Sequence, residues 1–208
     1  MKRSTDARSE AERLEGLWAG DFGNAYIERN IEAAKGRDRF WNAFLDKYRP
    51  KNVLEVGCNV GGNLKWLIGK VPPRDVIGVD INEKALAWLH QNMPSVNTLW
   101  SSARELPFRD RQFELTFTAG VLIHQPEDSL RDVMAELVRC SGRWVLCMEY
   151  FSKDTVEVPY RGQTGALFKR DYGAIYQRHF PELKLIEQGE LHEKDGWDQV
   201  TYWMFERP

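Results

Sequence analysis

The sequence predicts an α/β fold, with a mostly parallel sheet of seven strands and helices on both of its faces. Two observations predict it. Short apolar runs alternate with helical patterns from residue 52 to residue 149, which is typical of strands joined by crossover helices. The last two apolar runs, 183–190 and 197–206, are separated by a few polar residues, and so short a link makes an antiparallel hairpin.

Each element is expected from a local pattern. Apolar runs that end in glycine, acidic or small polar residues predict five strands before the hairpin, at 52–56, 75–79, 97–101, 113–118 and 143–149. Helical periodicity predicts helices at 62–68, 83–92, 126–138 and 166–179, the second of them with Asn82 as its N-cap. Residues 24–48 are expected to be helical with a break near Gly36, and residues 1–15 to be loose or a frayed helix.

The composition limits the classes of function. The chain has 208 residues, which fits one domain made of an N-terminal helical cap, 1–48, and a core, 49–208. The 29 basic and 31 acidic residues give a net charge of −2, which offers no general attraction for nucleic acid. No apolar run reaches the ~18 residues of a membrane span, and the N-terminus has no apolar signal-peptide core.

The chain has three cysteines, and no pair of them has the spacing of a metal site. Cys58, Cys140 and Cys147 are expected to be buried thiols, because free cysteine is among the most buried residue types. An odd number of cysteines suits a reducing compartment, so a cytoplasmic protein without a metal site is expected.

Ligands of open parallel sheets bind beyond the carboxyl ends of the strands. The most informative of these ends is the segment 54–62, LEVGCNVGG, in which Glu55 precedes several glycines. Gly57 and Gly61 would let the backbone bend and approach a ligand closely. Asp80 ends the second predicted strand, where its carboxylate suits the hydroxyls of a ribose.

Two cofactors fit this outline, a dinucleotide and S-adenosylmethionine, and Glu55 separates them. A dinucleotide would place an anionic pyrophosphate at this loop, where a carboxylate opposes it. S-adenosylmethionine brings a sulfonium and an ammonium group, which Glu55 would attract. The dinucleotide pattern GxGxxG would also fall on Gly57, Asn59 and Gly62, without its middle glycine. The predicted cofactor is therefore S-adenosylmethionine.

The sequence resembles class I S-adenosylmethionine-dependent methyltransferases, which implies a Rossmann-like fold. The family's first motif, an acidic residue followed by GxGxG, corresponds to Glu55, Gly57, Asn59 and Gly61, and its second motif to Asp80. The stretch 101–108, SSARELPF, resembles the family's GDAxxLPF. This implies that Ser102 takes the place of the aspartate that binds the adenine amine, with the Ala103 amide beside it; Asn59 likewise replaces a glycine.

A narrower resemblance concerns the N-terminal segment 17–30, LWAGDFGNAYIERN, together with 120–124, 167–171 and 201–206. These stretches resemble the pseudaminic acid biosynthesis-associated methylases. That group is associated with surface-sugar biosynthesis, and the association does not identify the methyl acceptor.

The N-terminal segment is expected to cover the cofactor, as it often does in this fold. Trp18, Phe22 and Tyr26 would share one face of a helix, but Gly20 and Gly23 favour a loop. Aromatic faces would attract a sulfonium and Arg29 a carboxylate; simple packing is the alternative. The residues expected at the cofactor are Tyr26, Arg29, Glu55, Gly57, Asn59, Gly61, Asp80, Ile81, Ser102, Ala103, Gly120 and Leu122.

His124 is the candidate general base, because it follows the fourth strand, where an acceptor should bind. The alternative is a local hydrogen bond or helix cap. Glu149 and Tyr150 end the fifth strand, where either would orient an acceptor or Glu149 would only bind a neighbouring amide. Tyr160, Arg161 and Arg170 are expected on a lid, where arginine would clamp an anion or form a solvated basic surface.

The predicted function is S-adenosylmethionine-dependent methylation of a small molecule, on oxygen or nitrogen of a sugar-related or anionic metabolite. A catalytically silent binding module is one alternative, because Asn59 and Ser102 depart from the cofactor motifs. A dinucleotide-dependent oxidoreductase is another, and Glu55 and the closing hairpin argue against it. A nucleic-acid methyltransferase is disfavoured, since the chain is weakly acidic and lacks an Asn/Asp-Pro-Pro-aromatic motif after the fourth strand.

Overall fold

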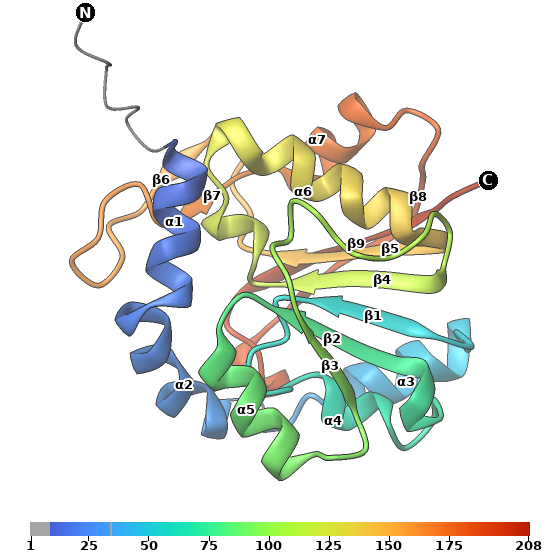
Figure 1. Cartoon of the computed structure of the whole chain (residues 1–208). Helices are drawn as coiled ribbons and strands as arrows, with labels where there is room; N and C mark the ends of the chain where they lie inside the picture. Colours follow the sequence, from blue (N-terminus) through green and yellow to red (C-terminus); the bar gives the residue numbers. More distant parts are fainter. Residues whose placement is uncertain (1–8, 34) are drawn as a thin grey trace, which may run out of the picture.

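The computed structural model describes residues 9–33 and 35–208, in which a seven-stranded sheet carries helices on both faces (Figure 1). The strand order is β3-β2-β1-β4-β5-β9-β8. The strands are β1 (Val53–Val56), β2 (Val76–Asp80), β3 (Asn97–Trp100), β4 (Phe113–Ala119), β5 (Ser141–Glu149), β8 (Lys184–Leu191) and β9 (Val200–Glu206). The first five strands are parallel, and β9 runs antiparallel to β5 and β8, so the predicted fold class is confirmed.

Helices cover the two faces of this sheet in separate groups. The helices are α1 (Glu10–Ala19), α2 (Asp21–Ala33), α3 (Asp38–Tyr48), α4 (Leu64–Leu67), α5 (Glu83–Asn92), α6 (Glu127–Cys140) and α7 (Tyr172–His179). Figure 1 shows α6 and α7 on one face and α3, α4 and α5 on the other. Successive residues of β5 alternate between the two cores, with Val145 and Cys147 packed in one core and Leu146 and Met148 in the other.

From Glu10 onwards the N-terminal segment is helical, which agrees with the helical alternative for the described part of residues 1–15 and corrects the loop expected at Gly20 and Gly23. Ser9 and Glu12 form a capping box at the start of α1, with each side chain bonded to the other's backbone N–H. Residues 1–8 and 34 lie outside the described part of the chain. Gly23 lies inside α2, where an added Cβ would sit 1.8 Å from the Trp18 carbonyl oxygen, so this glycine permits close packing of the two helices.

The helix expected at 166–179 is shorter in the structure, because residues 168–169 form a strand. β6 (Val156–Glu157) and β7 (Phe168–Lys169) form a small antiparallel ribbon, which Figure 1 shows beside α1. The helix begins only at Tyr172, because Asp171 caps it by accepting the N–H of Ala174 at 2.9 Å. The other predicted elements agree with the structure to within a few residues.

Short 3₁₀ helices complete the chain: η1 (Pro73–Asp75), η2 (Leu122–His124) and η3 (Glu193–Asp195). Asn82 caps α5 as predicted, since its side chain accepts the N–H of Ala85 at 2.9 Å. The three cysteines are buried free thiols, also as predicted. Within the described residues, no helix combines the length and the apolar character needed to cross a bilayer.

Trp41 anchors α3 to the sheet and supplies a test of this packing. Its side chain is fully buried, with its ring centroid 5.0 Å from that of Phe117 on β4. We expect Trp41→Ala to lower the free energy of unfolding by about 3–5 kcal/mol, because a large cavity would remain. Urea denaturation would measure this, with the exposed neighbour Asn42→Ala as the control. A loss below about 1 kcal/mol for Trp41→Ala would contradict the packing described here.

Candidate active site

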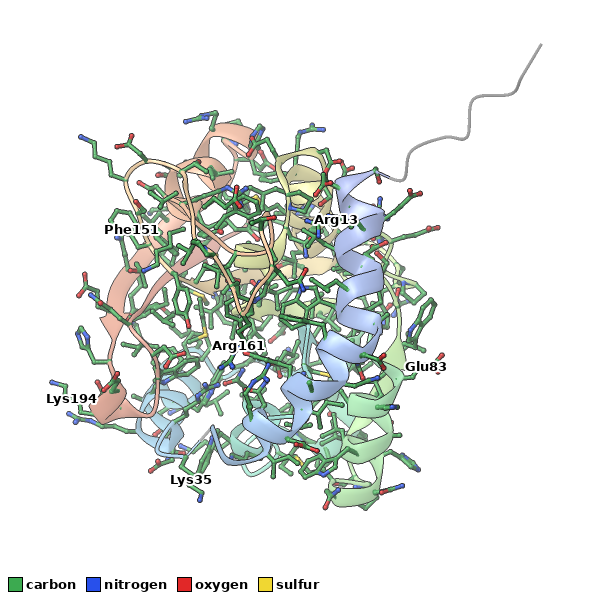
Figure 2. All side chains as sticks on the ribbon, turned by 90° about the vertical axis from the view of Figure 1, so that its left-hand side faces the viewer. Arg13, Lys35, Glu83, Phe151, Arg161 and Lys194 are labelled. Atoms are coloured by element: carbon green, nitrogen blue, oxygen red, sulfur yellow. The ribbon has the colours of Figure 1, made fainter. Side chains whose placement is uncertain are left out.

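A pocket opens at the carboxyl ends of the central strands. The strand ends contribute Glu55, Asp80 and Met148, and the N-terminal helices contribute Trp18 and Tyr26. The hairpin turn and the ribbon loop complete the lining with Trp197, Asp198 and Tyr160. Figure 2 looks onto this covering layer, with α1 in the foreground and the loop that carries Arg161 beside it.

The pocket brings together most of the residues predicted at the site. Those that line it are Tyr26, Glu55, Gly57, Asn59, Asp80, Ile81, Ala103, Gly120, His124, Tyr150 and Tyr160. The predicted residues that do not line it are Arg29, Gly61, Ser102, Leu122, Glu149, Arg161 and Arg170.

The loop after β1 takes a conformation that few residues tolerate. Gly57 has φ 77°, and an added Cβ there would lie 2.3 Å from a methyl group of Val121. Asn59 also has a positive φ, 46°, and its side-chain oxygen accepts the N–H of Val60 at 2.8 Å. Asparagine is among the few residues other than glycine that adopt this region readily. Asn59 therefore keeps the backbone shape that the motif's middle glycine would supply.

Glu55 is the most deeply buried acidic group that lines the pocket, with 1% of its surface exposed. Its Oε1 accepts a hydrogen bond from Asn63 at 2.7 Å, and its Oε2 has no partner. Burial raises the pKa of Glu55 to about 8; Asp80 adds to this rise, while Asn63 and Arg37 oppose it. Any cation that enters the pocket would stabilise the ionised form of Glu55.

Arg37 was not identified from the sequence, although it lines the pocket beside Glu55. Its Nη1 donates to the Asn63 side-chain oxygen at 2.8 Å, and its Nε donates to the Gly196 carbonyl at 2.9 Å. The guanidinium lies 4.0 Å from the ring centroid of Trp197. Arg37 is the only arginine or lysine among the described residues of the lining. The only sequence signal was the expected helix break at the neighbouring Gly36.

Asp80 is held at the end of β2 by two backbone amides. Its Oδ2 accepts the N–H of Asn59 at 2.7 Å, and its Oδ1 accepts the N–H of Asn82 at 2.8 Å. Burial raises the pKa of Asp80, although these amides oppose the rise. The Asn82 side chain also donates to the Trp18 carbonyl at 2.9 Å, which ties the N-terminal helices to the strand ends.

His124 is a neutral imidazole at the pocket wall. Its Nδ1 lies 2.6 Å from the Ala166 carbonyl oxygen, which can only accept, so Nδ1 carries the hydrogen and Nε2 has the free lone pair. Burial lowers the pKa of His124 to about 4, and the Ala166 hydrogen bond opposes this shift. The ring centroid lies 4.4 Å from that of Trp18 and 5.4 Å from that of Tyr160.

Three residues expected at the acceptor, Glu149, Arg161 and Arg170, do not line the pocket. Glu149 is fully buried and accepts the backbone N–H groups of residues 121–123, so the local alternative is the correct one. Arg170 is buried, donates to the Gln125 carbonyl at 2.9 Å and lies 4.3 Å from the Phe168 ring centroid. Arg161 is exposed and outside the pocket.

The remaining residues expected to contact the cofactor do not line the pocket either. Arg29 lies 5.0 Å from the Tyr26 ring centroid instead of lining the pocket. Gly61 lies against Leu89, and Leu122 is buried in the core. The Ser102 hydroxyl donates to the carboxylate of Glu15, a lining residue on α1 that sequence reasoning missed.

Asp198 is a further lining residue that the sequence pattern did not reveal. It lies in the turn before β9, where its Oδ2 accepts the hydroxyl hydrogen of Tyr150 at 2.8 Å. Burial and this bond raise the pKa of Tyr150. In the described ranges, no group of three or more His, Cys, Asp or Glu side chains is arranged to hold a metal ion.

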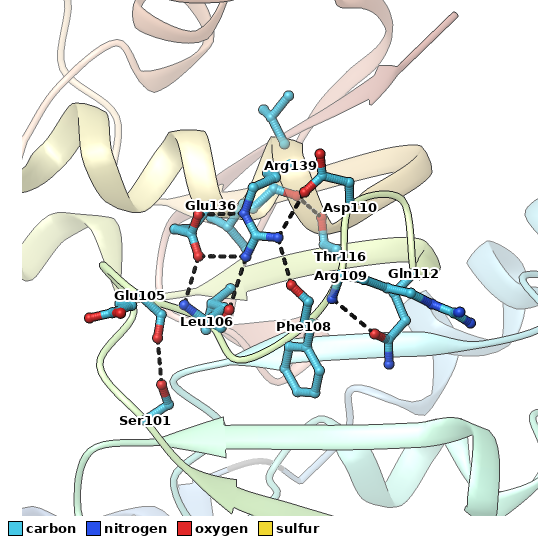
Figure 3. A network of polar contacts seen from close by, with 12 residues as sticks. Ser101, Glu105, Leu106, Phe108, Arg109, Asp110, Gln112, Thr116, Glu136 and Arg139 are labelled. Carbon is cyan, nitrogen blue, oxygen red and sulfur yellow. Dashed lines mark hydrogen bonds and ion pairs between the residues drawn. The ribbon is translucent and has the colours of Figure 1, made fainter.

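The loop after β3 is fixed to α6 by a polar network (Figure 3). Arg139 donates to the carbonyls of Leu106 and Phe108 at 2.9 and 2.6 Å, and Glu136 accepts the N–H of Leu106 at 2.7 Å. The Ser101 hydroxyl donates to the Glu105 carbonyl at 2.7 Å. The network holds in place the backbone that carries Ser101 and Ala103 at the pocket.

The part of the chain that contains β1 to β4 is similar to known proteins. Residues 53–142 match the family model described as Methyltransferase domain. Over 91 residues the chain is 31% identical to phthiotriol/phenolphthiotriol dimycocerosates methyltransferase 1 of Mycobacterium ulcerans. This match covers 43% of the chain and 33% of that relative, so it spans about a third of the relative's length.

Two solved structures share the whole fold. The 1,6-didemethyltoxoflavin-N1-methyltransferase of Burkholderia thailandensis, with bound S-adenosylhomocysteine, has a TM-score of 0.74 at 15% identity, covering 98% of this chain and 93% of that one. The magnesium protoporphyrin IX methyltransferase of Synechocystis PCC 6803, with bound SAM, has a TM-score of 0.70 at 12% identity, covering 99% and 100%. The chain therefore has the Rossmann-like fold of these methyltransferases, and its residues 53–142 match a methyltransferase domain.

Proposed function

We propose that the protein is an S-adenosylmethionine-dependent methyltransferase that acts on a small molecule. The observation that carries this proposal is Glu55, a buried acidic residue at the end of β1 that lines the pocket and has one carboxyl oxygen without a hydrogen-bond partner. Such a group attracts a cationic ligand and opposes the pyrophosphate of a dinucleotide. The family match of residues 53–142 and the fold support the same activity.

The lining residues suit each part of this cofactor. Glu55 would attract the ammonium group, and Arg37 would pair with the carboxylate of the same amino-acid end. Asp80 would accept the ribose hydroxyls, and Ile81 and Ala103 would flank the base. When bound, the cofactor supplies a methyl group on a cationic sulfonium, so the protein's part is chiefly to align the acceptor.

The acceptor side of the pocket is aromatic. Trp18, Tyr26 and Tyr160 line it together with His124 and the Tyr150–Asp198 pair. Because Arg161 and Arg170 do not line the pocket, the proposal favours oxygen or nitrogen of a sugar-related metabolite over an anionic one.

His124 is proposed as the group that accepts the acceptor's proton, through Nε2. Its lowered pKa keeps the ring neutral at physiological pH, so the lone pair is available, although its basicity is weak. The hydrogen bond to Ala166 holds the ring in this tautomer. An acceptor that carries no proton at its nucleophilic atom would not need this step.

The first test is calorimetric titration with S-adenosylmethionine, S-adenosylhomocysteine and NAD. We expect micromolar affinity for the first two and none for NAD, because the carboxylates of the lining oppose a pyrophosphate.

Asp80→Asn should weaken S-adenosylhomocysteine binding by about tenfold or more, since a charged acceptor of two ribose hydroxyls is lost. Asp154→Asn, at an exposed position, is the control. Unchanged affinity in Asp80→Asn would remove the ribose assignment.

A second prediction follows from the raised pKa of Glu55. With a pKa of about 8, this carboxyl is mostly protonated at pH 7 in the free protein, and the ligand's ammonium group lowers that pKa on binding. Binding of S-adenosylhomocysteine at pH 7 should therefore release protons, and affinity should rise from pH 7 to pH 8. Calorimetry in buffers of different ionisation enthalpy measures the release.

Glu55→Gln should abolish this proton release, whereas Glu182→Gln, at an exposed position, should keep it. Equal release from the parent and from Glu55→Gln would show that another group binds the ligand's ammonium.

A third prediction concerns His124. With an acceptor that turns over, His124→Ala should lower kcat by about 10²–10⁴-fold, the usual contribution of a general base. Affinity for S-adenosylhomocysteine should change little, because the imidazole faces the acceptor. Steady-state kinetics and calorimetry separate the two effects, and unchanged turnover would exclude His124 as the base.

A further inference from the structure

We propose that Glu15, on α1, selects the base of the cofactor by accepting a hydrogen bond from the 6-amino group of adenine. The inference rests on the proposed function, since it concerns the same pocket. It assigns base recognition to a helix that precedes the sheet, instead of to the loop after β3.

The strand order sets the direction in which the cofactor extends. The ends of β1, β2 and β3 lie next to one another in the sheet, and they carry Glu55, Asp80 and Ser101 respectively. A cofactor whose amino acid lies at Glu55 and whose ribose lies at Asp80 therefore has its base near the end of β3. The lining residues placed at this end are Ile81, which follows β2, Ser101 and Ala103 of the loop after β3, and Glu15, which is bonded to Ser102 and Arg104 of that loop.

Within this group, Glu15 carries the only charged side chain. The others offer apolar side chains, backbone groups and the Ser101 hydroxyl, and that hydroxyl already donates to the Glu105 carbonyl. Ser102, the residue expected to contact the amine, does not line the pocket, and its hydroxyl donates to Glu15. Glu15 thus supplies the carboxylate that position 102 lacks.

The Glu15 carboxylate is fixed by three hydrogen bonds and can accept one more. Arg104 binds it through both ends of its fork, with Nε donating to Oε1 at 2.9 Å and Nη2 donating to Oε2 at 2.6 Å. With the Ser102 hydroxyl on Oε1, three of about four lone-pair sites of a carboxylate are used. The free site is on Oε2.

The protonation state of Glu15 also fits an amine donor. Partial burial opposes ionisation, but hydrogen bonds from Arg104 and Ser102 lower the pKa of Glu15 below its ordinary value. An ionised carboxylate accepts hydrogen bonds and donates none. It therefore favours adenine, which offers an N–H at position 6, over hypoxanthine, which offers an oxygen there.

The position of Glu15 on α1 makes base recognition depend on the placement of this helix. α1 is also tied to the ribbon loop, because Arg13 donates to the carbonyls of Thr164 and Gly165 at 3.3 and 3.2 Å. Trp18, one turn further along α1, packs on His124. One helix thus contacts both the base end and the acceptor end of the pocket.

The test compares S-adenosylhomocysteine with S-inosylhomocysteine, which has oxygen in place of the 6-amino group, by calorimetric titration. We expect the parent protein to prefer the adenine ligand by about 10- to 100-fold, the worth of a hydrogen bond to a charged group. Glu15→Ala and Glu15→Gln should reduce this ratio to below about threefold. Alanine removes the acceptor, and the glutamine amide can donate to the hypoxanthine oxygen as well as accept from the adenine amine. Glu10→Gln, on the same helix and exposed, should keep the parent ratio.

The outcomes separate this inference from the proposed function. If Glu15 only fastens α1 to the loop, its variants will weaken both ligands equally and keep the ratio, which would overturn the inference alone. A parent ratio near one would also overturn it, without any variant that must fold. If the parent binds neither ligand, the proposed function fails and the inference fails with it.

Discussion

The burial of the Glu55 carboxylate is the constraint around which the pocket is arranged. An acidic group with so little exposure is costly unless it is neutralised or paired. Asn63 satisfies one oxygen, and Arg37 contacts the far side of Asn63, so the compensation reaches from the first loop to the start of α3. Arg37 then packs on Trp197, which extends the same arrangement to the closing hairpin. Three distant parts of the chain are therefore connected through one buried carboxyl group, and a cationic ligand would stabilise its ionised form.

The sheet alone would leave the pocket open, and the N-terminal helices provide the missing wall. Asn82 caps α5 through its oxygen and binds the end of α1 through its nitrogen, so one side chain connects the strand ends to the cover. The Arg139 network fixes the loop on which α1 rests through Glu15 and Arg104. The cover is thus attached to a rigid support, which is the usual requirement for precise binding.

Sequence reasoning predicted the parts of the site that depend on local chemistry. Strand ends, the glycine-containing loop, Asp80 and the Asn82 cap follow from patterns within a few residues. Glu15, Arg37 and Asp198 could not be predicted in the same way, since each reaches the pocket from a segment whose position depends on tertiary packing. The sequence left open whether Glu149 orients an acceptor or binds a neighbouring amide, and the pleat of the strand decides between them. Side chains alternate along a strand, so Met148 and Tyr150 line the pocket while Glu149 faces the loop beside it.

Asn59 shows how one substitution in a glycine motif changes more than the folded shape. A glycine at this position would adopt the same backbone angles, but it samples many more conformations in the unfolded chain and loses them on folding. Asparagine samples fewer conformations in the unfolded chain. Its side chain also accepts a hydrogen bond from the next backbone amide, which glycine cannot do. The loop at the end of β1 therefore gives up less conformational entropy when it forms than its glycine counterpart would, which favours a binding loop that is already ordered before any ligand arrives.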